Sequence, residues 1–282
     1  MATNPLTIFN QNFGIAERLL QVYQLANGLR PSELPSSLKQ ALCGFWGEPE
    51  NAHIKYAVND RVAILSRSAA RFPDAHMEEG GLDFLLRQAV IMACTSLETF
   101  FWDVVCANAL TLIRLRRSKA AQELKNLTLT LTLEEYVALE KYNDPEQRFN
   151  KILLKNFERK TLYDLKSIDQ IANILAVRNF WDQVEKTCGE PASNLRRLIG
   201  DLIARRNLIA HRADRPTDGG AGGGGGEVDG HGLRPITFSW THMRVQATKT
   251  LVSAAAVILT DSVNRLEQQH GANLDSSIIK GG

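Results

Sequence analysis

Residues 195–212 read Leu-Arg-Arg-Leu-Ile-Gly-Asp-Leu-Ile-Ala-Arg-Arg-Asn-Leu-Ile-Ala-His-Arg, and this stretch predicts an amphipathic helix that faces a core. Its apolar residues recur at the spacing i, i+3, i+4, i+7 and i+8, which places them on one helix face. They are Leu195, Leu198, Ile199, Leu202 and Ile203. The next position on this face, about three turns after Leu195, is Arg206. A buried guanidinium keeps its charge, so Arg206 needs an anionic partner within the protein or on a ligand.

A second helix is predicted over residues 82–109, where the sequence is apolar on nearly every side. It carries Glu98, which must be paired if the helix is buried. Its most apolar part, residues 89–113, approaches the length of a membrane span, but Glu98 and Asp103 are costly at bilayer depth. We therefore expect the central helix of a bundle and no membrane partner.

The rest of the chain indicates an all-α fold, an antiparallel helical bundle with an additional N-terminal helical layer. A closing helix is predicted over about 242–269, which Gly271 can end. Before it comes a flexible loop, residues 218–232, in which nine of fifteen residues are glycine. The predicted parts are an N-terminal helical extension of unknown role (1–80), the bundle with its loop (81–270) and a flexible tail (271–282).

Composition sets the general class of the protein. The 282 residues include 33 basic and 31 acidic side chains, a net charge of +2, so the whole chain shows no preference for a polyanion. The four cysteines are far apart and form no CxxC pair, which favours reduced thiols. Because the first residues lack a basic segment followed by an apolar one, we expect a cytoplasmic protein.

Positive charge does gather locally. Residues 195–215 hold six arginines and two aspartates, a net +4. Asn207 and His211 are four residues apart and so share one side of the helix. Three arginines flank them: Arg205, Arg212 and Arg215. This is where the sequence favours binding of a polyanion.

Other chemistries lack their signatures. No histidine pair at i, i+4 and no cysteine pair indicates a metal site. The glycine-rich loop follows no predicted strand and ends in no GKS or GKT, which argues against a nucleotide-binding loop. No GxSxG elbow, dinucleotide fingerprint or clear helix-turn-helix is present. We expect no cofactor and no metal.

The segment Arg205-Arg206-Asn207-Leu208-Ile209-Ala210-His211-Arg212 resembles the signature of the HEPN superfamily: an arginine, a polar residue, three mostly apolar residues and a histidine. The helix from Leu85 to Trp102, with Leu97-Glu98-Thr99-Phe100, resembles the first helix of that family. The resemblance covers about residues 82–269 and is closest to the RiboL-PSP-HEPN branch. It implies an HEPN-like bundle acting as a metal-independent endoribonuclease, commonly a toxin or phage-defence effector, with a composite site formed across a homodimer.

Candidate roles follow from the resemblance and from the chemistry of RNA cleavage through the 2′-hydroxyl. Histidine moves protons near neutral pH and arginine stabilises charge on phosphorus, so His211 is the expected general acid/base and Arg206 the expected cation. Asn207 is expected to orient His211 or the phosphate. Glu98 is expected to pair with Arg206 or His211, in an orienting or a catalytic role. The expected products carry a 2′,3′-cyclic phosphate and a 5′-hydroxyl, and Arg205, Arg212 and Arg215 are expected to contact the RNA.

The main alternative is a non-catalytic HEPN-like helical module that binds RNA or scaffolds a partner protein, since a fold does not determine a function. An antitoxin or another regulatory protein is a further possible partner. A homodimer is expected in either case, because one motif supplies half of a composite site.

Overall fold

The protein is described by a computed structural model that covers residues 4–67, 81–116, 132–134, 137, 164–175, 177–216, 228, 229 and 232–279. It is mostly helical, and its helices pack as a bundle, which confirms the predicted fold class. Most of the predicted glycine-rich loop, residues 218–227 together with 230 and 231, lies outside the described residues.

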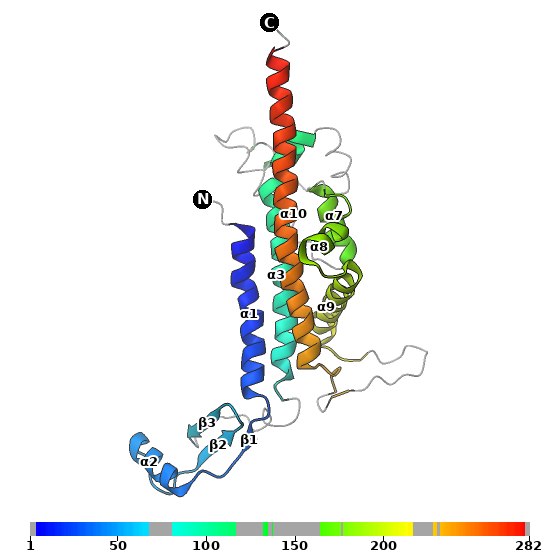
Figure 1. Ribbon diagram of the computed structural model, residues 1–282. Helices are drawn as coiled ribbons and strands as arrows, with labels where there is room; N and C mark the ends of the chain where they lie inside the picture. The colour runs from blue at the N-terminus through cyan, green and yellow to red at the C-terminus, as the bar shows by residue number, and fades with distance from the viewer. Residues whose placement is uncertain are drawn as a thin grey trace, which may run out of the picture.

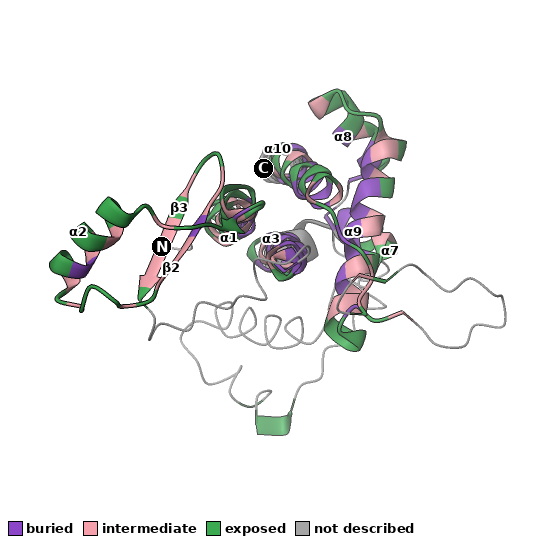
Figure 2. Ribbon diagram, turned by 90° about the horizontal axis from the view of Figure 1, so that it is seen from below, coloured by how far each residue is buried: buried purple, intermediate pink, exposed green. Residues whose placement is uncertain are grey.

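The bundle is built around one central helix, α3 (Asp83–Arg116). Three long helices pack against it: α1 (Pro5–Ala26), α9 (Ala192–Arg212) and α10 (Phe238–Ile279). Figure 2 looks along α1, α3 and α10 and shows α3 between these two helices and α9, which runs obliquely beside them. Two shorter helices, α7 (Leu165–Ile174) and α8 (Phe180–Cys188), lie beside α9. The nearly all-round apolar character of residues 82–109 thus reflects contacts on several sides of α3.

Aromatic side chains connect three helices across the core. Phe9 of α1 meets Phe100 of α3 edge to face, with ring centroids 6.0 Å apart. Phe100 contacts Phe101 in the same way at 5.4 Å, and Phe101 contacts Phe180 of α8 at 6.3 Å. Such edge-to-face pairs add to the stabilisation that burial provides. The N-terminal helix α1 is therefore part of the bundle core.

The N-terminal segment differs from the expected helical layer, because residues 30–67 contain a small sheet. The sheet has the order β1-β2-β3 and is antiparallel throughout, with Tyr56 opposite Leu65. Its strands are β1 (Arg30–Pro31), β2 (Ile54–Val58) and β3 (Ala63–Arg67), and α2 (Ser36–Trp46) lies between β1 and β2. These strands were missed because they are at most five residues long and have no clear alternation of apolar and polar residues.

Two helix bounds also differ from the sequence analysis. The closing helix α10 begins at Phe238, where the Thr237 hydroxyl accepts a hydrogen bond from the Trp240 N–H at 3.2 Å. It continues through Gly271 to Ile279, so this glycine does not end it. A glycine lowers helix propensity but does not by itself stop a helix.

The apolar segment Asp83–Asn108 of α3 is long and apolar enough to cross a membrane by length and composition alone, yet most of it is buried inside the bundle. A lipid-facing helix would present its apolar side chains outward instead. Burial among protein helices supports the interpretation of this segment as a core helix.

The aromatic core leads to a stability prediction. Phe100 is 1% exposed and Phe45 of α2 is 84% exposed. We expect Phe100→Ala to lower the free energy of unfolding by about 3–5 kcal/mol through lost burial and an incompletely filled cavity. We expect the control Phe45→Ala to change it by less than about 0.5 kcal/mol. Denaturant unfolding followed by circular dichroism measures both, and equal losses would contradict this placement of the core.

Candidate functional site

The side chain of Arg206 is buried between α9 and α3, as its place on the apolar face predicts, with 9% of the residue exposed. Its Nη2 donates to Oε2 of Glu98 on α3 at 3.0 Å. Its Nη1 donates to Oδ1 of the neighbouring Asn207 at 3.0 Å. The expected pairing of Glu98 with Arg206 is therefore present, and the pair holds the two helices together.

The buried thiol of Cys94 lies beside this pair. Cys94 lies one turn before Glu98 on α3 and is 3% exposed. Burial raises the pKa of the Cys94 thiol to about 12, and the nearby charge of Arg206 offsets only part of this effect. The thiol thus stays protonated near neutral pH, and it is a neighbour of the ion pair rather than a candidate nucleophile.

His211 lies in the last turn of α9 and is exposed to solvent. It is four residues after Asn207, so the two share one side of the helix. Arg206 is five residues before His211, and at 3.6 residues per turn their side chains leave the helix in directions about 140° apart. Arg206 faces α3 while His211 faces solvent, and the guanidinium of Arg206 contacts Asn207, which shares one side of the helix with His211.

The three arginines expected to contact RNA have different positions. Arg212 and Arg215 are exposed. Arg205 instead points into the fold, where its Nη2 donates to Oδ2 of Asp214 at 2.7 Å and to the carbonyl oxygens of Arg234 and Pro235 at 2.8 and 3.1 Å. The expectation that Arg205 contacts RNA stays a prediction, and its side chain is engaged in these intramolecular bonds.

The local excess of positive charge is smaller than the sequence indicates. Four of the six arginines in residues 195–215 lie within 4 Å of a carboxylate. These pairs are Arg196–Asp169, Arg197–Asp201, Arg205–Asp214 and Arg206–Glu98. Among the described residues, Arg212 and Arg215 have no such partner, so within residues 195–215 the arginines without a carboxylate partner lie at the end of α9 that carries His211.

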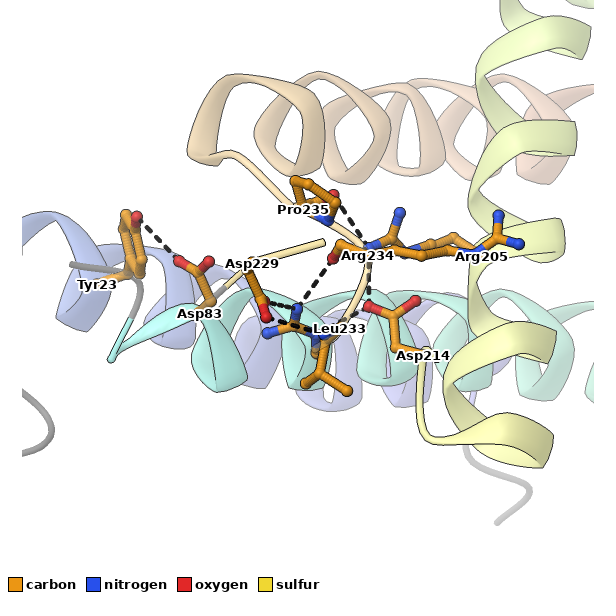
Figure 3. A network of polar contacts seen from close by, with 9 residues as sticks. Tyr23, Asp83, Arg205, Asp214, Asp229, Leu233, Arg234 and Pro235 are labelled. Carbon is orange, nitrogen blue, oxygen red and sulfur yellow. Dashed lines mark hydrogen bonds and ion pairs between the residues drawn. The ribbon is translucent and has the colours of Figure 1, made fainter. Parts of the chain in front are cut away.

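A buried polar network that the sequence analysis missed lies just beyond this end of α9. Arg87 of α3 donates from Nε to Oδ2 of Asp214 at 2.8 Å, and from Nη2 to Oδ2 of Asp229 at 2.7 Å. The same Nη2 donates to the carbonyl oxygen of Arg234 at 3.0 Å. Figure 3 shows Asp214, Asp229 and Arg234 converging with Arg205 in this network. The network binds the end of α9 and the segment before α10 to the start of α3.

A signal for this network was present in the sequence. Arg87, like Glu98, is a charged residue in a helix that is apolar on nearly every side, so it also required a buried partner. Burial opposes the charge of Arg87, but the hydrogen bonds to Asp214 and Asp229 outweigh this effect and raise its pKa above the ordinary value. Which carboxylates would serve could not be inferred, because they are far from Arg87 in the sequence.

A pocket of about 320 Å³ lies between α7, α8 and α9, with Asp169, Trp181 and Arg196 in its lining. Arg196 is fifteen residues before His211, which corresponds to about 22 Å along the helix. In the part of the chain that the structure describes, no group of three histidine, cysteine or carboxylate side chains could hold a metal ion. His211, Arg212 and Arg215 are exposed at the end of α9, where a long ligand can reach them.

Comparison with known proteins agrees with this geometry. The family model described as RiboL-PSP-HEPN matches residues 56–222, more than half of the chain. The match includes α3 and α9, and thus Glu98, Arg206 and His211. Searches of curated proteins and of solved structures gave no match. HEPN domains are commonly ribonucleases. The chain belongs to the RiboL-PSP-HEPN family.

Proposed function

We propose that this protein is a metal-independent endoribonuclease that cleaves RNA through its own 2′-hydroxyl. The observation that carries the proposal is the arrangement at the end of α9. An exposed His211 follows, by one turn, a chain of contacts from Glu98 through Arg206 to Asn207. Exposed Arg212 and Arg215 stand beside it for contacts with phosphates.

The reaction needs two proton transfers and one stabilised charge. The 2′-oxygen attacks the adjacent phosphorus, the bond from phosphorus to the 5′-oxygen breaks, and the fragments carry a 2′,3′-cyclic phosphate and a 5′-hydroxyl. A base accepts the 2′-proton and an acid gives a proton to the 5′-oxygen. Imidazole suits both tasks near neutral pH. We assign this acid/base role to His211.

Arg206 is the proposed cation for the phosphorane-like transition state. A guanidinium has five N–H donors, and Glu98 and Asn207 are bound through Nη2 and Nη1. Asn207 is partly exposed, so the chain of contacts from Glu98 through Arg206 to Asn207 ends near the surface of α9. In this proposal Glu98 orients the guanidinium and Asn207 orients either the guanidinium or the phosphate.

A homodimer is part of this proposal. One copy presents one exposed imidazole at the end of α9, whereas the reaction uses a base and an acid. Two facing copies supply two histidines, one as base and one as acid. We propose such a composite site, with a role as a cytoplasmic toxin or phage-defence effector that an antitoxin or another regulatory protein restrains.

One observation favours a second candidate function, an HEPN module that binds RNA without cleaving it. The charge of Arg206 is balanced by Glu98 in a largely buried pair, with side chains 10% and 17% exposed. A structural pair of this kind needs no catalytic explanation. Substitutions at the site separate the two functions, because RNA cleavage, RNA binding and stability can each be measured on the same variant.

Replacement of His211 tests the cleavage reaction. We expect wild-type protein to cut total RNA in excess EDTA, and His211→Ala to cut it about 10²–10⁴-fold more slowly because the proton transfers lose their carrier. The control is His242→Ala, which removes an exposed histidine from α10. Analysis of the fragment ends should find cyclic phosphates. Cleavage that stops in EDTA and returns with a divalent ion would contradict metal independence, and a fully active His211→Ala would contradict the assigned role.

Replacement of the buried pair separates stability from catalysis. Arg206→Leu leaves Glu98 without its partner and should lower the free energy of unfolding by about 3–5 kcal/mol. The double variant Arg206→Leu with Glu98→Leu should recover most of this loss, because two apolar side chains then fill the space. We expect neither variant to cleave RNA. A double variant that is stable and cleaves at the wild-type rate would make the pair purely structural.

The exposed arginines should be visible in the salt dependence of RNA binding. In the inactive His211→Ala background, Arg212→Gln and Arg215→Gln should each reduce the slope of log affinity against log salt by about 0.7, the value for one phosphate contact on a single strand. Arg197→Gln is the matched control, since Arg197 is exposed but pairs with Asp201 at 3.6 Å. Fluorescence anisotropy with a labelled RNA gives the slopes, and identical slopes for the three variants would contradict the proposed contacts.

A further inference from the structure

Two buried ion pairs of opposite polarity connect α3 with α9 and the residues that follow it. In the first pair α3 supplies the negative charge, since Glu98 accepts from Arg206 at 3.0 Å. In the second pair α3 supplies the positive charge, since Arg87 donates to Asp214 at 2.8 Å. Arg87 and Glu98 are eleven residues apart, about three turns, and so lie on one face of α3. A shift of α9 along α3 by one turn breaks both pairs at once.

His211 lies in the sequence between the two residues that these pairs hold, five after Arg206 and three before Asp214. Its side chain is exposed, and among the described residues no hydrogen bond or ion pair restrains it. The last turn of a helix is also where fraying starts. The position of His211 therefore depends on how firmly the backbone on both sides of it is held.

The backbone after His211 needs support, because it adopts a left-handed conformation at two consecutive residues. Ala213 has a φ of 48° and Asp214 a φ of 62°. This region is unfavourable for residues with a Cβ atom, although aspartate and asparagine enter it more readily than most. Such a bend persists when surrounding contacts compensate for it.

The contacts of Asp214 supply this compensation. Asp214 is completely buried, and its Oδ2 accepts hydrogen bonds from Arg87 and from Arg205, at 2.8 and 2.7 Å. Its backbone is held as well, because its N–H donates to the carbonyl of Leu208 at 3.1 Å and its carbonyl accepts from the N–H of Arg234 at 3.0 Å. Figure 3 shows Asp214 at the point where the chain leaves α9, beside Arg205 and Arg234.

We propose that Asp214, held by Arg87, is a positioning residue for His211: it fixes the last turn of α9 on α3 and thereby sets the place of the imidazole relative to Arg206. This inference rests on the proposed ribonuclease function. Asp214 is completely buried, so it acts through the backbone and touches no RNA. Loss of the carboxylate leaves the two arginines without the charged acceptor that they share, and the last turn of α9 loosens.

The test is the variant Asp214→Asn, since asparagine has nearly the same shape and tolerates the left-handed backbone. With a defined RNA oligonucleotide as substrate, we expect kcat to fall about 10–100-fold while KM stays within twofold, because a misplaced imidazole slows chemistry without removing phosphate contacts. Hydrogen exchange of the backbone amides of residues 209–212 should become faster. Arg87→Lys, which keeps the charge but loses the fork of donors, should change kcat in the same direction.

The matched control is Asp201→Asn on the same helix. Asp201 also accepts from a buried arginine, Arg244, at 2.6 Å, but it lies ten residues before His211. The variant Asp201→Asn should keep kcat within twofold of the wild-type value. Equal losses of kcat in Asp201→Asn and Asp214→Asn would show general weakening and overturn the positioning role. An Asp214→Asn variant with wild-type kcat would also overturn the positioning role, but it would leave the ribonuclease assignment intact. RNA left uncut by the wild-type protein would overturn the proposed function itself.

Discussion

The burial of α3 is the constraint on which the rest of the structure depends. A helix covered by α1, α9 and α10 has little access to water, so each charged residue on its buried face requires a partner from a neighbouring element. Glu98 finds Arg206, and Arg87 finds Asp214 and Asp229. The two pairs have opposite polarity, so they form only when α9 has one direction and one register along α3. Apolar packing alone specifies this direction and register less strictly.

This constraint also explains why the candidate site has a buried half and an exposed half. Arg206 belongs to the packed interface and is held in place by Glu98 and Asn207. His211 belongs to the end of the helix, where α9 extends beyond its last deeply buried turn and faces solvent with Arg212. A long anionic polymer can reach exposed side chains of this kind. The division between a buried arginine and an accessible histidine is therefore a consequence of where the packing of α9 ends.

The elements outside the motif helices have a mechanical role in this arrangement. Helix α1 covers one side of α3 through Phe9 and Phe13 and is joined to α10 by the ion pair between Glu17 and Lys249, 2.7 Å long. The first part of the N-terminal segment thus completes the bundle rather than forming a separate layer. The small sheet that follows α1 lies at the same end of the molecule as the last turn of α9 (Figure 1).

Much of the local structure could be predicted from the sequence, because apolar periodicity reports directly which face of a helix is buried. It located α3 and α9, it placed Arg206 on the buried face, and it required a partner for Glu98. It did not detect the short strands, whose residues carry too little pattern to distinguish them from loops. The roles of His211, Arg206, Asn207 and Glu98 in cleavage stay predictions.

The contrast between Arg205 and Arg206 shows what tertiary structure alone decided. The two residues are neighbours in the chain and chemically identical, and the sequence by itself determined that Arg206 faces the core, because this depends on helical geometry within α9. The environment of Arg205 depends on Asp214 and on the backbone of Arg234. Arg234 follows the glycine-rich segment in the sequence and returns to the side of α9 only in the folded chain. Periodicity carries information about neighbours one or two turns away. It carries none about contacts between residues separated by tens of positions, and for this reason the buried network around Asp214 became visible only in the folded protein.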